Sequence, residues 1–217
     1  MLTSIYNIIV DILFPLRCIS CKKNGSYICD DCIPPPNRRE IESLENIDAC
    51  FDYRNPIIKK MIWDLKYYNK RSAGAVLGRH LYEYVQEEIS DLHILHRGEP
   101  FIVIPVPLSR ERHRERGYNQ AEYIARGFVN ANPNIFVLNT DIVVKQINTG
   151  PQARINNKKR RLKNIKGAFK LKDGANVKNK IIFVVDDVTT TGGTLSEIIH
   201  ILKKAGAREI RGLAVAH

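Results

Sequence analysis

The feature that most constrains this chain is the run "IIFVVDDVTTTGGTLSEI" at residues 181–198. Its apolar start is typical of a buried strand, and that strand ends on two adjacent carboxylates, Asp186 and Asp187. A short loop of threonine and glycine follows, and a helix is expected from Thr194. Paired acids at the end of a buried strand have no packing role. The run therefore predicts a ligand site at the carboxyl edge of a parallel sheet.

The loop after the two acids has the composition of an anion site. Glycines let the backbone approach a ligand closely, and N–H groups at a helix N-terminus attract phosphate. The carboxylates suit sugar hydroxyls or a hydrated metal ion, so the two halves together fit a ribose 5-phosphate group. The spacing matches neither G-x-x-x-x-G-K-[ST] nor G-x-G-x-x-G, and an ordinary strand–turn–helix connection is the alternative. The residues assigned to this site are Asp186, Asp187, Val188, Thr189, Thr190, Thr191, Gly192, Gly193 and Thr194.

Apolar runs and helical patterns alternate along the rest of the chain. Strands are expected at 101–107, 141–145, 180–186 and 210–216, and helices at 56–68, 73–89, 119–131 and 194–206. Continuous apolar strands alternating with amphipathic helices predict the α/β class, with a parallel sheet flanked by helices. The polar, lysine-rich stretch 146–180 is expected to be an excursion from that sheet.

Four of the five cysteines form two C-x-x-C pairs, and the turn dipeptide Asn24-Gly25 lies between the pairs. Two such pairs can supply four thiolates to one tetrahedral zinc ion, and a four-thiolate site is structural. Two disulfides or redox-active pairs are the alternatives, although disulfides are disfavoured in a cytoplasmic chain. Cys50 lies outside the array and is expected to be a small buried hydrophobic residue. The predicted zinc ligands are Cys18, Cys21, Cys29 and Cys32.

Three consecutive prolines at 34–36 cannot continue a helix or a central strand. They suggest a division into an N-terminal helix with a four-cysteine zinc module, residues 1–40, and a main domain, residues 41–217. The N-terminal run "MLTSIYNIIVDILFPLR" has no basic residue before its apolar part and is interrupted by Asp11. It therefore predicts an amphipathic helix and not a signal peptide. No stretch approaches the length of a membrane span, and the expected location is the cytoplasm.

The positive charge is concentrated in the main domain. Residues 1–50 hold 5 basic and 7 acidic residues, whereas residues 51–217 hold 29 basic and 16 acidic ones. This excess favours phosphate-rich partners. Between Ile142 and Lys172 there are ten basic residues and no acid, which predicts a lid over a phosphorylated ligand or a track for nucleic-acid phosphates. Solvated lysines are the alternative. The candidate residues in this segment are Lys158, Lys159, Arg160 and Arg161.

A second basic segment, "PLSRERHRERGYNQ", directly follows the expected strand at 101–107. It should therefore hang over the same sheet edge as the threonine–glycine loop. Arginine pairs with phosphate oxygens in a bidentate way, although a self-paired charge run is the alternative. The candidates are Arg110, Arg112, Arg114 and Arg116. Phe169, Tyr67 and Tyr68 could stack on nucleic-acid bases, but core packing is expected for each.

The run 181–198 resembles the phosphoribosyl-pyrophosphate (PRPP) motif of type I phosphoribosyltransferases. With the C-x-x-C pairs after "LFPLRC", the segment "PVPLSRERHRERGYNQAEYIAR" and the segment "RRLKNIKGAF", the chain is similar to the ComF family over nearly its whole length. The resemblance implies a zinc-finger-like module, a phosphoribosyltransferase-like domain and PRPP bound with Mg²⁺. It also implies a part in DNA uptake during natural transformation, with single-stranded DNA and other competence proteins as candidate partners. The arginines after the 101–107 strand would contact pyrophosphate.

Two functions follow from this resemblance. One is a competence protein that binds PRPP and acts in the uptake or processing of single-stranded DNA. The other is an active Mg²⁺-dependent phosphoribosyltransferase or PRPP hydrolase, and a PRPP sensor is a weaker third. The sequence contains no recognisable acceptor pocket or positioned general base, so no catalytic residue is assigned.

Overall fold

The computed structural model describes residues 16–37, 39–40, 46–96, 99–146 and 167–217. In this part of the chain a six-stranded sheet has the order β1-β2-β8-β7-β3-β4. All neighbouring strands pair in parallel except β1 with β2, so the predicted parallel sheet is confirmed. The strands are β1 Arg39–Glu40, β2 Ile47–Phe51, β3 Phe101–Pro105, β4 Phe136–Leu138, β7 Ile181–Val188 and β8 Glu209–Ala216.

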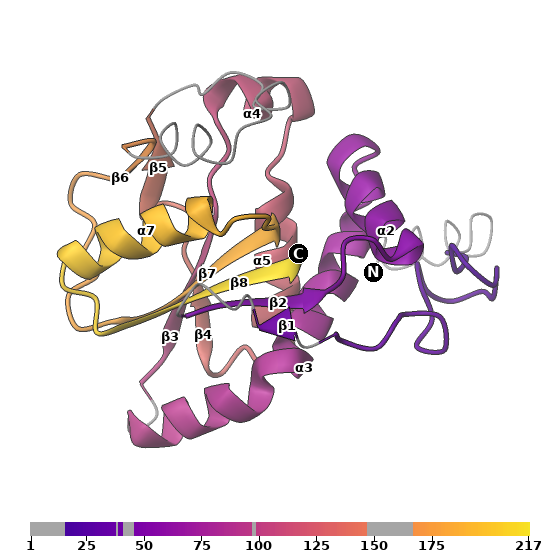
Figure 1. Cartoon of the computed structure of the whole chain (residues 1–217), viewed down its shortest axis with the longest axis horizontal. Coiled ribbons are helices and arrows are strands. Elements are labelled where there is room, and N and C mark those ends of the chain that lie inside the picture. Colours follow the sequence, from indigo (N-terminus) through magenta and orange to yellow (C-terminus); the bar gives the residue numbers. More distant parts are fainter. Residues whose placement is uncertain (1–15, 38, 41–45, 97–98, 147–166) are drawn as a thin grey trace, which may run out of the picture.

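Helices cover both faces of this sheet (Figure 1). α7 (Gly193–Lys204) lies on one face, and α3 (Arg71–Leu95) and α5 (Gln120–Ala131) lie on the other. α2 (Pro56–Tyr67) stands beside the carboxyl ends of β7 and β8, and the short helix α4 (Arg110–Arg116) follows β3. The four-cysteine segment lies on the far side of α2 from the sheet. α2, α4 and the loop between β7 and α7 therefore lie toward the carboxyl edge of the sheet.

The central strand β7 explains why the sheet needs cover on both faces. Ile181, Phe183 and Val185 belong to the hydrophobic cluster that includes α3 and α5. Ile182 and Val184 belong to the cluster that includes α7. Successive side chains of a strand point to opposite faces, so a continuous apolar run is stable only when both faces are buried.

α3 and α5 pack in close contact because glycines line their crossing. A Cβ atom at Gly78 would lie 2.0 Å from the carbonyl oxygen of Ile124, and one at Gly127 would lie 2.4 Å from that of Ala75. Only a residue without a Cβ permits this approach of two helix backbones. The packing fixes α3 beneath the sheet and, through it, the helix α2 that precedes it.

Some elements differ from the sequence-based expectation. The helix expected at 73–89 is longer and spans Arg71–Leu95. The strand expected at 141–145 is β5 (Val143–Lys145), which lies outside the main sheet and pairs antiparallel with β6 (Phe169–Leu171). β2, β4 and α4 were not predicted from the sequence. Their segments are short or rich in charged residues, and they become ordered by pairing with or packing on neighbouring elements.

Several expectations concern residues outside the described ranges. They are the N-terminal helix and the basic residues Lys158, Lys159, Arg160 and Arg161. Within the part of the chain that is described, no helix is long and apolar enough to cross a membrane. Cys50 is fully buried, with its Sγ 3.8 Å from the carbonyl oxygen of His80, so its prediction as a core residue is confirmed.

Candidate functional site

The loop that follows β7 is a tight turn held at both ends. The Thr189 N–H donates to the carbonyl oxygen of Ala216 at 2.9 Å, which keeps the start of the loop beside β8. The Thr189 hydroxyl, itself only 5% exposed, accepts from the Gly192 N–H at 3.1 Å and closes the turn. His217 Nε2 lies 3.0 Å from the carbonyl oxygen of Thr190. The loop backbone is therefore shaped before any ligand arrives.

Gly192 directs the chain from the turn into α7. It occupies the N-cap position with a φ of 68°, a left-handed conformation that favours glycine. No side chain of the described residues caps this helix, so its first backbone N–H groups are open to an anion. The partial positive charge of a helix N-terminus adds to their attraction for phosphate. This end of α7 directly adjoins the two acids of β7.

The two acids differ in their surroundings. Asp187 is buried, at 4% exposed, and its carboxylate lies 2.9 Å from the ammonium of Lys66 on α2. Asp186 accepts a hydrogen bond of 2.8 Å from the backbone N–H of Asp187. One carboxylate therefore has a cationic partner already, while the other depends on backbone donors and more distant charges.

Burial and the neighbouring Asp187 carboxylate raise the pKa of Asp186 to about 7. The backbone N–H of Asp187 and the ammonium groups of Lys66 and Lys145 oppose that rise without cancelling it. A cation or a hydroxyl donor beside such a carboxyl group stabilises its ionised form. The acid pair is thus electrostatically prepared for a cationic or hydroxyl-rich ligand.

Lys145 and Arg112 add positive charge near this acid pair. Lys145, at the end of β5, is partly buried, and its pKa is lowered by burial and by Arg112, while Asp186 acts in the opposite direction. The Lys145 ammonium also lies 5.4 Å from the centre of the Phe169 ring. The carboxyl edge of the sheet therefore combines Asp186 and Asp187 with the cations Lys66 and Lys145, whose charges do not cancel the rise in the pKa of Asp186.

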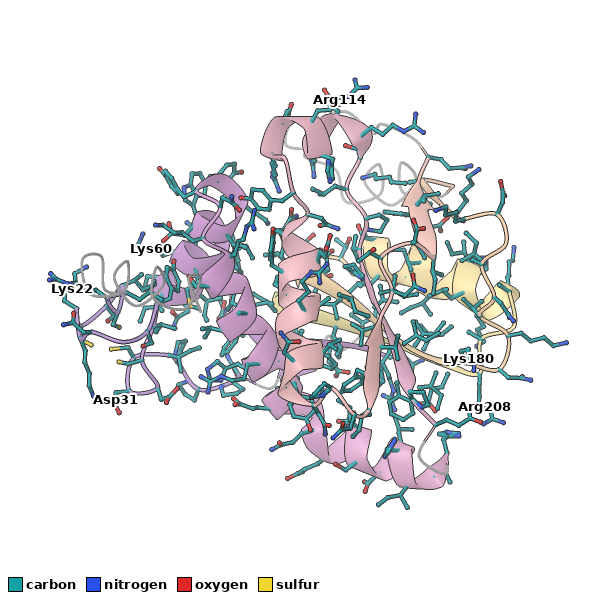
Figure 2. All side chains as sticks on the ribbon, turned by 180° about the vertical axis from the view of Figure 1, so that it is seen from behind. Lys22, Asp31, Lys60, Arg114, Lys180 and Arg208 are labelled. Atoms are coloured by element: carbon teal, nitrogen blue, oxygen red, sulfur yellow. The ribbon has the colours of Figure 1, made fainter. Side chains whose placement is uncertain are left out.

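The four arginines proposed from the sequence lie on one helix but have different surroundings. α4 is capped by Ser109, whose hydroxyl accepts from the Arg112 N–H at 3.3 Å, and it ends at Gly117. Of these four arginines, Arg112 lies close enough to Lys145 to lower the pKa of its ammonium group. Arg114 projects from the outer side of α4 (Figure 2). Arg116 donates to Gln120 Oε1 at 3.0 Å, and Arg110 is exposed.

The four cysteines of the N-terminal segment form one cluster. The sulfur atoms of Cys18, Cys21, Cys29 and Cys32 all lie within 4.8 Å of one another, and the Sγ atoms of Cys21 and Cys29 are 3.6 Å apart. Thiolates around a tetrahedral zinc ion are separated by about 3.8 Å, so the cluster could hold a metal such as zinc. Burial opposes ionisation of Cys18, but backbone N–H groups of the segment outweigh it and lower its pKa to about 6.

A buried hydrogen bond connects this cysteine segment with α2. The Tyr27 hydroxyl donates to Asp64 Oδ2 at 2.6 Å, and Lys60 pairs with the same carboxylate at 3.0 Å. Burial and the Asp64 carboxylate raise the pKa of Tyr27, so it stays a donor. Asp64 and Lys66 share α2, and the helix therefore contacts the cysteine segment at one residue and the acid pair at the other.

A parallel sheet with two acids at the end of a central strand, followed by a threonine–glycine loop and an uncapped helix, defines a type I phosphoribosyltransferase-like protein. In agreement, a family model described as the phosphoribosyl transferase domain matches residues 120–217. Competence protein F of Haemophilus influenzae is 36% identical over 240 residues, which cover 94% of this chain and 98% of that protein. The chain belongs to the ComF family.

Two further relatives extend the comparison. The DNA utilization protein YhgH of Escherichia coli K12 is 27% identical and covers 84% of this chain and 74% of its own length. Competence protein ComFC of Streptococcus pneumoniae is 28% identical over 54% of this chain and 48% of its own length.

Sequence reasoning identified the acid pair and its loop but missed two cations beside them. Lys66 and Lys145 come from α2 and β5, far from residues 181–198 in the sequence. Lys66 lies in an amphipathic helical pattern without any motif, so only the folded structure shows that it contacts Asp187. Lys145 ends the expected strand "DIVVK" within the acid-free segment, and that position was the one available signal.

Proposed function

We propose that this protein binds PRPP together with Mg²⁺ at the carboxyl edge of its sheet. The observation that carries the proposal is the juxtaposition of the Asp186–Asp187 pair with the uncapped N-terminus of α7. PRPP has ribose hydroxyls beside a 5-phosphate and a pyrophosphate, so it presents a partner for each half of the site. Mg²⁺ would neutralise part of the pyrophosphate charge.

Each part of the site has a proposed role. Asp186 and Asp187 accept hydrogen bonds from the ribose hydroxyls. The 5-phosphate is held by backbone N–H groups of the loop 189–194 other than those of Thr189 and Gly192, which already donate within the fold. We assign the pyrophosphate to Lys145 and Arg112, because Lys145 is close enough to both Arg112 and Asp186 to be influenced by their charges. We keep Arg110, Arg114 and Arg116 as more distant pyrophosphate or nucleic-acid candidates. Binding would also require Lys66 to share or release Asp187.

The biological role that fits best is in competence. A relative of nearly the same length is named a competence protein, and others are named DNA utilization proteins. We propose that this protein acts in the uptake or processing of single-stranded DNA during natural transformation. Competence proteins and single-stranded DNA are its proposed partners, with Lys158, Lys159, Arg160 and Arg161 as candidate phosphate contacts.

The proposal includes an organisation and a location. We assign residues 1–40 to a zinc module and residues 41–217 to the phosphoribosyltransferase-like domain. We place the protein in the cytoplasm, because a four-thiolate metal site requires reduced cysteines. The alternative function is an active Mg²⁺-dependent phosphoribosyltransferase or PRPP hydrolase, which the same loop would serve.

Isothermal calorimetry with PRPP tests the proposal. The native protein should bind PRPP in the presence of Mg²⁺, and Asp186→Asn with Asp187→Asn should weaken binding at least about tenfold. Asp173→Asn, at an exposed turn residue away from the sheet edge, is the matched control and should bind normally. No heat of binding to the native, folded protein would refute the ligand assignment. Pyrophosphate release during the same incubation would favour the enzyme alternative.

A further inference from the structure

The outer face of α2 carries large aromatic side chains that the core does not use. Trp63, Tyr67 and Tyr68 are 49%, 56% and 65% exposed. The sequence-based expectation that Tyr67 and Tyr68 would pack in the core is wrong, whereas Phe169 is buried as expected. α2 buries its other face through Ile58, Met61, Ile62 and Leu65. The aromatic face is therefore not needed to attach the helix.

These rings are arranged as a platform. The Trp63 and Tyr67 rings have centroids 4.3 Å apart and are tilted by 45°. The Arg116 guanidinium lies 5.5 Å from the centre of the Tyr67 ring, so Tyr67 is in contact with both Trp63 and a cation. Trp63 and Tyr68 both line one hollow of about 390 Å³. A ligand that enters this hollow therefore meets two exposed aromatic side chains.

The surroundings of the hollow are basic. Lys59 and Lys60 line it with Pro56 and Asp64, and the Lys60 side chain points outward from α2 (Figure 2). Asp64 is the single acid of this lining, and it is 7% exposed and already bound by Tyr27 and Lys60. Aromatic faces flanked by lysines match the stacked bases and phosphates of a nucleic-acid strand.

We infer that the outer face of α2, centred on Trp63 and Tyr68, is a binding site for single-stranded DNA. Bases stack on the two rings, and phosphates pair with Lys59 and Lys60. A duplex cannot use the rings in this way, because its bases already stack on one another. The choice of DNA over RNA rests on the proposed function in competence; the choice of a single strand rests on the exposed rings.

The outer face of α2 lies next to the carboxyl edge of the sheet. Lys66, one turn further along α2, contacts Asp187, and Arg116, which packs on Tyr67, belongs to α4 above the same edge. A strand that lies along α2 therefore runs toward the acid pair. The inference uses none of the residues 158–161.

Trp63 makes the inference directly testable, because it is the only tryptophan of the chain. Oligo(dT) of about 12 nucleotides should quench the tryptophan emission of the native protein in a saturable way. Tyr68→Leu should weaken binding roughly five- to a hundredfold, whereas Tyr68→Phe, which keeps the ring, should bind like the native protein. Leu95→Ala, at an exposed apolar residue near the end of α3, is the control and should change nothing.

Several outcomes would overturn the site. They are unchanged tryptophan emission at saturating oligo(dT), equal affinities of the two Tyr68 variants, or quenching by duplex DNA as strong as by the single strand. Tighter binding of oligo(U) than of oligo(dT) would overturn the assignment to DNA. Calorimetry with PRPP on Tyr68→Leu separates this inference from the proposed function. If PRPP fails to bind while oligo(dT) quenches Trp63 with the expected ring dependence, only the PRPP assignment of the proposed function fails.

Discussion

The ammonium of Lys66 lies 2.9 Å from the carboxylate of Asp187, and their side chains are 19% and 6% exposed. The contact joins α2 to the end of the central strand β7. Asp187 would otherwise be a buried charge next to a second carboxylate, an arrangement that costs several kcal/mol unless a cation compensates it. The ion pair thus allows a folded protein to keep two acids at the carboxyl end of its central strand.

Lys66→Met should destabilise the protein because it leaves Asp187 buried without its cation. We expect the free energy of unfolding in urea at pH 8 to fall by about 2–3 kcal/mol, which is less than the roughly 3–5 kcal/mol of a fully buried pair, since Lys66 retains some solvent contact. Lys59→Met, on the exposed face of the same helix, should have almost no effect. Adding Asp187→Asn to Lys66→Met should restore most of the loss. A double variant no more stable than Lys66→Met would contradict this account.

The raised pKa of Asp186 predicts a pH-dependent stability. In the unfolded chain an aspartate titrates near about 4, whereas burial and Asp187 raise its folded-state pKa to about 7. The folded protein therefore binds the proton more tightly, and this group lowers the free energy of unfolding as the pH rises from about 4 to about 7. Asp186→Asn should remove that loss.

The measurement is urea unfolding of the native protein and of Asp186→Asn at pH 5 and pH 8. The variant should gain stability relative to the native protein on going to pH 8, by at most about 4 kcal/mol. It should at the same time lose affinity for PRPP. Asp173→Asn serves as the control for removal of one negative charge. An equal stability difference at both pH values would show that Asp186 titrates normally.

Metal analysis tests the cysteine cluster. Because four sulfur atoms lie within 4.8 Å of one another, the purified, reduced protein should contain one zinc per chain, and Cys29→Ser should lose most of it. Cys50→Ala, which removes a buried thiol outside the cluster, should keep its zinc. Metal removal should also weaken the attachment of Tyr27 to Asp64, visible as faster hydrogen exchange in α2. A reduced, folded protein without metal would refute the zinc assignment.

The crossing of α3 and α5 should not tolerate a methyl group. Gly78→Ala would place a Cβ against the Ile124 carbonyl oxygen, a backbone atom that cannot move aside alone. We expect a loss of roughly 1–3 kcal/mol, typical of overpacking, in spite of the better helix propensity of alanine. Glu87→Ala, on the exposed side of α3, is the control. Thermal unfolding of both variants distinguishes the effects, and an unchanged melting temperature for Gly78→Ala would disprove the tight crossing.

The sequence alone determined the features that are written in contiguous residues. The strand, acid pair and threonine–glycine loop at 181–198 predicted the parallel sheet and the position of the two acids at the carboxyl end of one of its strands, which the structure confirms. The ligand site at this edge stays a prediction. The C-x-x-C spacing predicted a cluster of four thiols, which the structure forms. In each of these cases the chemistry and the geometry lie within one short segment, so periodicity and spacing suffice to recognise them.

The tertiary structure decided everything that depends on two distant segments meeting. Nothing local marks Lys66 as the partner of Asp187, and the place of Lys145 at the end of an expected strand does not show that its neighbour is Asp186. The short strand β2 forms because β8 offers it a parallel partner. The exposure of Tyr67 and Tyr68 follows from which face of α2 packs on the core, and their residue type suggested the opposite. Long-range packing sets these relationships, because burial and electrostatic pairing depend on the position of the whole element.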